Sequence, residues 1–464
     1  MTSKLLGLLA TLPICINAAP KLLPRQDSSN TATVDFSAQA RRGAPQNLAS
    51  GVLYGIPDDP TQIPDHFYTE MGYNYARIGG AQLDAGGWID GIDAYYARFN
   101  NTRDNYFQAR KFGANVIVLP HDIWGTDHAN DSTVWPGDNG DWTNYDQYLD
   151  QLIGDLKDNN MLDGLVYDTW NEPDGGFFWK RSQAQYLDLW SRTYQRIRQD
   201  ADLAGVLISG PSYAGTPNTG NDWWTNWTAR IVADNTIPDQ YSWHDEPGDV
   251  AVDIPQWNSI QQQYSLPDKE ININEYATFD QQVSCGAAWW ISRLERYNLR
   301  GLRGNWLSGW QLRDFLASLL TKTDTNDYTG TGYAGNGEFN VYKYYHLNMT
   351  GERATTTGTG DGVMDVYATI DSDKARILTG VNNQQGTWFI TLNNLSALGL
   401  STSGTLNIQT WGFDDAGHFG AVATYSDRGV YGHDYDNDQV TFPVFQTSQD
   451  EHTAWAFEFA VGTS

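Results

Sequence analysis

The 464-residue chain is strongly acidic, with 29 Lys and Arg against 56 Asp and Glu and a formal charge of −27. This charge excludes nucleic acid and anionic membrane surfaces as expected partners, because both require a basic footprint. The chain also contains 19 Trp and 26 Tyr, whose flat faces can stack on sugar rings as well as fill a core. Neutral carbohydrate is therefore a partner that the composition allows.

The first residues have the pattern of a secretory signal. Lys4 precedes an apolar run over residues 5–16, and Ala18 and Ala19 supply the small residues that signal peptidase prefers. We expect a signal peptide over 1–19, since the run is too short to span a membrane. Residues 20–42 are polar and predict a flexible N-terminal segment or pro-segment, so the mature protein is expected to be secreted and extracellular.

Two further features agree with export. Five Asn-x-Ser/Thr sequons predict N-glycans, at Asn100, Asn130, Asn226, Asn348 and Asn394. Beyond the signal the only cysteine is Cys285, which excludes an intrachain disulfide. Its apolar surroundings predict a small buried side chain, not a nucleophile.

Residues 43–348 repeat one theme, a short apolar run followed by a helical pattern. Eight such units predict an α/β fold of the (β/α)8 TIM-barrel type. A doubly wound sheet would alternate similarly, but no Gly-rich phosphate loop follows the first strand. The predicted strands cover residues 51–56, 75–78, 115–119, 165–170, 205–209, 240–244, 271–275 and 302–306.

The composition changes after about residue 348. Gly, Thr, Ser and Asn increase, and short alternating runs recur, which is typical of strands. We expect residues 349–464 to form a smaller β-sandwich. It could bind carbohydrate or brace the barrel, and bracing is the favoured role.

Two predicted strands end on carboxylates. The fourth strand is followed by Asn171, Glu172 and Pro173, and the seventh ends on Glu275 and Tyr276. Asn171 and Pro173 could instead cap the next helix, and Glu275 could be a surface acid. The carboxyl ends of barrel strands meet at one mouth, however, and glycoside cleavage requires two carboxyl groups there.

Other polar and aromatic residues follow strands in the same way. Arg77 could hold a carboxylate ionised, and His244 or Tyr276 could hold a sugar or orient the nucleophile. Each also has an ordinary structural role, such as a surface ion pair or a local hydrogen bond. Candidates to line the substrate site are Trp88, His121, Asp122, Trp124, Trp306 and Trp310. The scattered histidines lack metal-ligand spacing, so we expect neither a metal nor a cofactor.

The residues 170–174, followed by Phe177, Phe178 and Trp179, resemble glycoside hydrolase family 39, known for β-xylosidases and related exo-glycosidases. The resemblance extends over the barrel and the β-rich region. It implies that Glu172 is the general acid/base, that Glu275 is the nucleophile, and that Asn171 contacts the sugar 2-hydroxyl. It also implies retention of configuration.

The resemblance and the residues together predict a secreted glycosidase acting on oligo- or polysaccharides of plant or microbial cell walls, exo-acting and β-xylosidase-like. One alternative is an endo-acting β-glycanase of the same clan. Another is a carbohydrate-binding wall protein that has lost catalysis. For a retaining enzyme we expect the carboxyl groups of Glu172 and Glu275 to lie about 5–5.5 Å apart, against about 6.5–9.5 Å for an inverting one.

Overall fold

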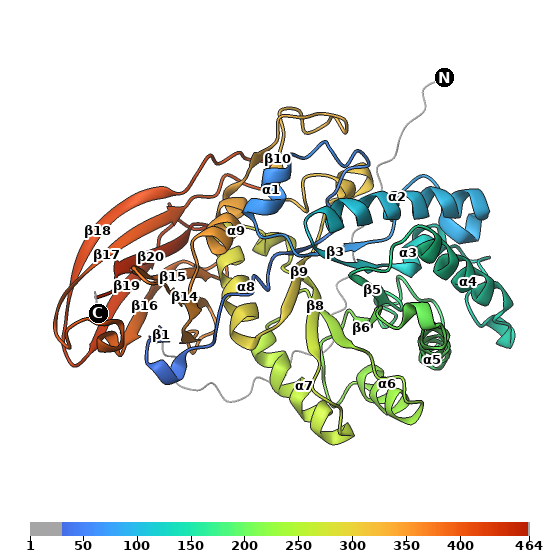
Figure 1. Ribbon diagram of the computed structural model, residues 1–464, viewed down its shortest axis with the longest axis horizontal. Coiled ribbons are helices and arrows are strands. Elements are labelled where there is room, and N and C mark those ends of the chain that lie inside the picture. Colours follow the sequence, from blue (N-terminus) through green and yellow to red (C-terminus); the bar gives the residue numbers. More distant parts are fainter. Residues whose placement is uncertain (1–29, 463–464) are drawn as a thin grey trace.

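The computed structural model describes residues 30–462. The predicted signal peptide over 1–19 lies outside the described residues. Figure 1 shows a barrel surrounded by helices on one side of the molecule and a group of long strands on the other, with α8 and α9 between them.

Eight parallel strands close into a barrel in chain order, which confirms the predicted α/β barrel. The strands are β2 (Gly51–Leu53), β3 (Tyr75–Ile78), β4 (Asn115–Val118), β5 (Leu165–Asp168), β6 (Leu207–Tyr213), β7 (Gln240–Asp245), β8 (Glu270–Tyr276) and β9 (Arg300–Arg303). The helices of this part are α1 (Asp65–Glu70), α2 (Ile92–Lys111), α3 (Pro120–Trp124), α4 (Thr143–Asp158), α5 (Gln183–Gln199), α6 (Asp222–Ala233), α7 (Val250–Tyr264), α8 (Ser284–Tyr297) and α9 (Gly337–Leu347). The short strands β10 (Leu320–Thr321) and β11 (Ala334–Gly335) pair with each other.

Several strand boundaries differ from the sequence prediction; β2, for example, ends at Leu53 before the expected 56. β6 continues to Tyr213 although residues 205–209 were expected, and β9 ends at Arg303 before the expected 306. A Gly-Pro pair usually marks the end of a strand. Gly210 and Pro211 nevertheless stay paired with Tyr241 and Ser242 of β7, so the strand continues through them.

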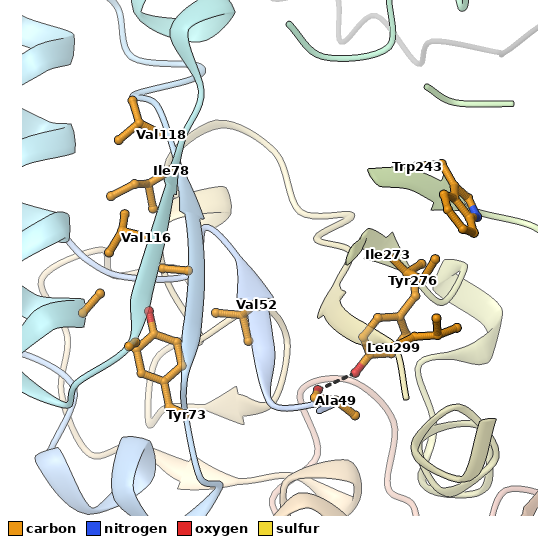
Figure 2. Packing of buried hydrophobic residues seen from close by; sticks show 14 of the residues in the cluster. Ala49, Val52, Tyr73, Ile78, Val116, Val118, Trp243, Ile273, Tyr276 and Leu299 are labelled. Atoms are coloured by element: carbon orange, nitrogen blue, oxygen red, sulfur yellow. Dashed lines mark hydrogen bonds between the residues drawn. The ribbon is translucent and has the colours of Figure 1, made fainter. Parts of the chain in front are cut away.

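The barrel is held by buried aliphatic and aromatic side chains. Figure 2 shows Val52, Ile78, Val116 and Ile273 from four of the strands, all at most 1% exposed. Removing one such side chain costs its transfer free energy plus that of the cavity left behind, about 2–5 kcal/mol for a large-to-small change. This packing fixes the strand ends from which the candidate site is built.

Two further sheets lie beside the barrel. One has the order β13-β1-β16-β19, and the other has the order β12-β14-β15-β20-β17-β18. Their strands are β1 (Thr31–Asp35), β12 (Glu352–Arg353), β13 (Thr355–Thr357), β14 (Met364–Ile370), β15 (Lys374–Val381), β16 (Gly386–Asn393), β17 (Gly404–Phe413), β18 (Ser426–Tyr435), β19 (Gln439–Gln446) and β20 (Ala454–Ala460). The rings of Phe442 in β19 and Phe457 in β20 lie 5.0 Å apart, so the two sheets share one core. We call these sheets the accessory region.

The position of β1 corrects the expectation for residues 20–42. Thr31–Asp35 is not part of a flexible segment: it lies between β13 and β16 and runs parallel to β16. Its alternating pattern buries Ala32 and Val34 completely. The sequence contains this alternation, but the partner strands lie more than 300 residues away along the chain and could not be identified from it.

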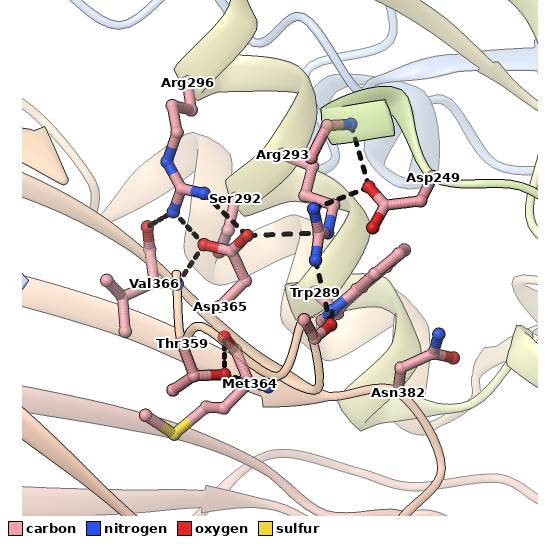
Figure 3. Close-up of polar contacts among 12 residues, drawn as sticks. Asp249, Trp289, Ser292, Arg293, Arg296, Thr359, Met364, Asp365, Val366 and Asn382 are labelled. Atoms are coloured by element: carbon pink, nitrogen blue, oxygen red, sulfur yellow. Dashed lines mark hydrogen bonds and ion pairs between the residues drawn. The ribbon is translucent and has the colours of Figure 1, made fainter. Parts of the chain in front are cut away.

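A buried charge network joins the barrel to the accessory region (Figure 3). Arg293 and Arg296 on α8 both pair with Asp365 of β14, and Arg293 also pairs with Asp249 before α7. Asp365 is fully buried. Because an isolated buried carboxylate would be unfavourable, the two arginines and Asp365 require each other, and this requirement fixes α8 against β14.

Other expectations concern the surface. The side chains of the sequon residues Asn100, Asn130, Asn226 and Asn394 are exposed and that of Asn348 is half-buried; glycosylation there stays a prediction. Cys285 is buried, without a disulfide. Among residues 30–462 no helix combines the length and the hydropathy needed to cross a membrane.

Candidate active site

Four barrel strands bring ionisable side chains to one end of the barrel. Arg77 lies in β3, His244 in β7 and Glu275 in β8, each near the end of its strand. Glu172 follows β5, whose last residue is Asp168. Because all eight strands are parallel, these side chains meet at the carboxyl-terminal mouth, where barrel enzymes have their active sites.

Arg77 connects several of these groups. Its guanidinium is fully buried and donates to Glu275 Oε1 at 2.5 Å, to Asp168 Oδ2 at 2.8 Å and to Asn171 Oδ1 at 2.6 Å. Charge-assisted hydrogen bonds of this kind are about twice as strong as neutral ones. Arg77 therefore pairs with the Glu275 carboxyl group and fixes the orientation of the Asn171 amide.

Asp168 was not among the residues predicted for the site. It is completely buried and accepts hydrogen bonds from Arg77, from Ser212 Oγ at 2.9 Å and from Asn274 Nδ2 at 3.3 Å. A carboxylate with this many donors is stable in a buried position. The sequence could have identified Asp168 as a site residue because it is the polar residue that ends β5.

The backbone of Glu172 has an unusual conformation. Its φ is +40°, a value that non-glycine residues rarely adopt, and its N–H donates to the Ser212 carbonyl at 2.9 Å. The next long helix, α5, begins at Gln183 and is capped by Ser182, whose Oγ accepts from the Gln185 N–H. Glu172 is thus not a helix cap, which removes the alternative reading of this residue.

His244 lies between the two glutamates. Its Nδ1 is 2.7 Å from Glu172 Oε1, and its Nε2 is 3.5 Å from Glu275 Oε1. Burial lowers the pKa of His244 to about 4, against the opposing charge of Glu275. The imidazole is therefore neutral above this pH, with one nitrogen donating and the other accepting.

The two carboxyl groups lie close together in different surroundings. One oxygen of each and a ring nitrogen of His244 all lie within 4.8 Å of one another. Burial raises the pKa of Glu172, although the charges of Arg77 and His121 lower it. The side chains of Glu172 and Glu275 keep 21% and 16% exposure, so both can be reached from the mouth.

Glu172, His244 and Glu275 are also the only group of three or more His, Cys, Asp or Glu side chains within residues 30–462 that could hold a metal ion. Arg77 already contacts Glu275 Oε1, and this positive charge opposes a cation at the same oxygen. The positive charge of Arg77 at these three side chains therefore favours a pair of hydrogen-bonded carboxyl groups over a bound metal ion.

Tyr276 does not join the site, contrary to its prediction as a substrate-binding residue. Its ring is fully buried, and its hydroxyl contacts the Ala49 carbonyl at 2.8 Å (Figure 2). The same hydroxyl lies 2.7 Å from that of Tyr342. Successive side chains of a strand point to opposite faces. Since Glu275 faces the barrel mouth, its neighbour faces the surrounding helices.

His121 and Trp124 are also buried. His121 Nε2 lies 3.1 Å from Asp122 Oδ1, and the His121 ring packs edge-on against Phe178. Trp124 is 0% exposed and packs against Trp170. Trp124 therefore supports the segment that leads to Glu172 and offers no face to a sugar, while His121 acts on Glu172 through its charge.

The two tryptophans after β9 differ in exposure. Trp306 is 42% exposed, and its Nε1 donates to the Ala277 carbonyl at 3.0 Å, two residues beyond Glu275. Trp310 is half-buried, with its ring 5.4 Å from that of Tyr328. Trp306 is thus placed to meet a ligand at the mouth, and Trp310 packs within its own loop. Trp88 donates to Asn144 and packs on α2 and α4.

A third carboxyl group at the mouth was missed by the sequence prediction. Glu246 follows His244 by two residues, and its Oε1 is buried without a hydrogen-bond partner. Burial, followed by the charges of Glu275 and Glu172, raises its pKa well above the usual value. A Cβ on Gly304 would lie 1.9 Å from this oxygen, so a larger residue at 304 would displace the carboxyl group of Glu246. The signal was the polar run after β7.

The sequence matches no family model and no curated protein. Solved structures with the same fold exist at low identity. N2152 from Neocallimastix frontalis is 19% identical with a TM-score of 0.72, covering 93% of this chain and 99% of that one. A GH39 enzyme from Xanthomonas axonopodis pv. citri is 13% identical with a TM-score of 0.57, covering 95% and 100%.

A GH30 endoxylanase from Clostridium papyrosolvens is 16% identical with a TM-score of 0.54, covering 93% and 100%. The GH39 and GH30 structures are thus similar to this chain to about the same degree. The likeness shows a common fold over barrel and accessory region together, and it does not select family 39 over family 30.

Proposed function

We propose that the protein is a secreted, retaining glycoside hydrolase that cleaves O-glycosidic bonds of plant or microbial cell-wall glycans. Glu172 is the general acid/base and Glu275 is the nucleophile. The observation that carries this proposal is the pair of carboxyl groups within 4.8 Å, joined through His244 and supported by Arg77. A short separation of this kind suits a covalent glycosyl-enzyme route, because inversion needs room for a water between acid and sugar.

The arrangement gives the two carboxyl groups opposite protonation states. Neutral His244 can accept from protonated Glu172 through Nδ1 while its Nε2–H is directed at Glu275. Arg77 compensates the charge of Glu275. Glu172 then protonates the leaving oxygen as Glu275 attacks the anomeric carbon, and the same Glu172 later activates the water that releases the sugar.

For the substrate we propose a neutral pyranoside, cleaved in an exo, β-xylosidase-like manner as in glycoside hydrolase family 39. Arg77 occupies Oδ1 of Asn171, which leaves the Nδ2 hydrogens free to donate to a sugar 2-hydroxyl. Trp306 offers an exposed indole face nearby. A uronic acid is disfavoured, since the ionised nucleophile Glu275 would repel its carboxylate.

An endo-acting β-glycanase is the second candidate, since the fold is shared with an endoxylanase as well as with a GH39 enzyme. A non-catalytic wall protein is the third, and the intact carboxyl pair with its supporting network opposes it. In all three cases we propose that the accessory sheets form a β-sandwich that braces the barrel through α8.

The test is hydrolysis of nitrophenyl glycosides and wall polysaccharides, with products analysed by length and anomer. Glu172→Ala should abolish cleavage of substrates with poor leaving groups, whereas nitrophenyl glycosides should still release nitrophenol in a burst, because nitrophenol departs without a proton and only the later hydrolysis of the intermediate lacks its base. Glu275→Ala should abolish both, because no covalent intermediate can form.

Azide then separates the two roles. With a β-linked activated substrate, azide should yield the β-glycosyl azide from Glu172→Ala and the α-azide from Glu275→Ala. In the first variant azide intercepts the intermediate from the acid side, and in the second it attacks directly from the nucleophile side. Near-normal activity of both variants would show that the chemistry lies elsewhere.

A further inference from the structure

The loop between β17 and β18, residues 414–425, extends from the accessory region to the mouth of the barrel. Its His418 ring lies 4.0 Å from the ring of Phe279, with 30° between their planes. The next residue, Phe419, packs edge-on against Phe315, with 5.1 Å between ring centroids. The accessory region thus adds aromatic side chains to loops that follow β8 and β9.

Hydrogen bonds to two barrel helices fix this loop. At the start of α9, Asn336 Nδ2 donates to the His418 carbonyl at 3.1 Å. At the start of α8, the Ser284 N–H donates to Asp415 Oδ2 at 3.1 Å. A loop held in this way is ordered before a ligand arrives, so little entropy is lost when one binds.

The aromatic residues at this place are exposed. Phe279 is 44% and Phe419 is 39% exposed, whereas aromatic residues of the two cores are almost fully buried. Phe279 lies four residues after Glu275. Trp306, itself exposed, donates to the carbonyl of Ala277 between them. Four residues span at most about 14 Å of chain, which limits the distance between the backbone of Phe279 and that of Glu275.

We infer that Phe279, His418 and Phe419, here called the aromatic shelf, bind a sugar unit of the substrate next to the unit at the cleaved bond. This inference rests on the proposed glycosidase function. Flat apolar ring faces suit the apolar face of a pyranose. Ala277, whose carbonyl accepts from Trp306, lies midway along the chain between Glu275 and Phe279, which places the shelf on the same loop as the end of the catalytic strand.

A purely bracing role does not explain the shelf. The contacts of Ser284 and Asn336 hold the loop by its backbone and by Asp415, and they do not require Phe279 and Phe419 to face solvent. Single exposed hydrophobic residues are ordinary, but a contiguous group marks an interaction site. The accessory region is therefore part of the substrate site as well as a support.

The test compares Phe279→Ala and Phe419→Ala with wild type and with Phe107→Ala, a control on α2 whose side chain is 46% exposed. Each is assayed on a nitrophenyl monoglycoside that wild type cleaves and on short oligosaccharides of the same sugar. We expect the shelf variants to lose about tenfold in kcat/KM on oligosaccharides, mainly through KM, as for loss of one aromatic contact. The monoglycoside rate and the control should not change.

The outcomes separate the two hypotheses. Equal effects on monoglycoside and oligosaccharides, or no effect on either, would overturn the shelf and leave the glycosidase in place. A wild-type protein inactive on every glycoside would overturn both. Circular dichroism shows whether each variant is folded. If Phe279→Ala does not fold, His418→Ala replaces it as the second shelf variant.

Discussion

The hydrogen bond between His244 and Glu172 gives a direct test of how the site keeps its acid protonated. Replacing His244 by Ala removes the Nδ1 acceptor that lies 2.7 Å from Glu172 Oε1. The neutral form of Glu172 loses a partner, and water gains access to a carboxyl group whose pKa is raised first of all by burial. Both effects favour the ionised form.

The size of the effect follows from the single hydrogen bond. A net contribution of about 0.5–1.5 kcal/mol, at about 1.4 kcal/mol per tenfold change, corresponds to about 0.4 to 1 pH unit. Activity is lost as the pH rises through the pKa of the acid. The midpoint of the basic limb of kcat/KM should therefore move to lower pH by this amount.

The assay is the pH dependence of kcat/KM for two substrates. The shift should be seen with a poor leaving group and be absent with an activated nitrophenyl glycoside, which needs no proton. The matched control is His128→Ala, because His128 lies outside the site and pairs with Asp90. A basic limb that stays in place, or moves to higher pH, would refute the role given to His244.

Three further predictions follow from buried charges. Arg77→Lys should lower kcat about 100-fold with little change in KM, because a lysine cannot reach all three acceptors and each charge-assisted hydrogen bond is worth about 1.5–3 kcal/mol. Steady-state kinetics, together with a melting curve to show that the variant is folded, measures this effect. An unchanged kcat would contradict the prediction. Burial raises the pKa of Asp253 to about 6, and burial and the charge of Asp253 raise that of Asp245. The contribution of this pair to the free energy of unfolding is therefore fully present below the unfolded pKa near 3.8 and is lost as the pH rises through 6. Asp245→Asn should flatten this dependence in melting curves between pH 4 and pH 8, and an equally steep slope in the variant would exclude the pair as its source. Asp365→Ala removes the carboxylate paired with half-buried Arg296 and one of the two carboxylates paired with buried Arg293. It should lower the free energy of unfolding by about 3–5 kcal/mol in urea titrations, whereas a loss below about 1 kcal/mol would show that water replaces the carboxylate.

Much of the barrel could be predicted because its signals are local. Each strand is a short apolar run with a polar end, and Glu172 and Glu275 stand at such ends. Arg77 and His244 were found by the same reasoning. Asp168 and Glu246 occupy equivalent positions and were missed, since an acid at a strand end does not show whether donors surround it.

Strand parity explains the error at Tyr276. Adjacent residues of β8 point to opposite faces of the sheet. If Glu275 faces the barrel mouth, the side chain of Tyr276 must face away from it and cannot contact the substrate. The same rule applied to β7 separates His244 from Asp245: His244 faces Glu172, and Asp245 lies against Asp253 under α7. Once one residue of a strand is assigned to the mouth, the sequence alone gives the direction in which each neighbouring side chain points.

Contacts between distant parts of the chain could not be predicted from the sequence. The alternation in Thr31–Asp35 identifies a strand but not its partners, which come from residues beyond 350. The loop over 414–425 likewise has no local signal that places His418 against Phe279. Because β17 and β18 carry this loop and α8 fixes the sheet that contains them, the network at Asp365 also positions the aromatic shelf. A change at that buried carboxylate should therefore weaken oligosaccharide cleavage before it weakens cleavage of a nitrophenyl monoglycoside.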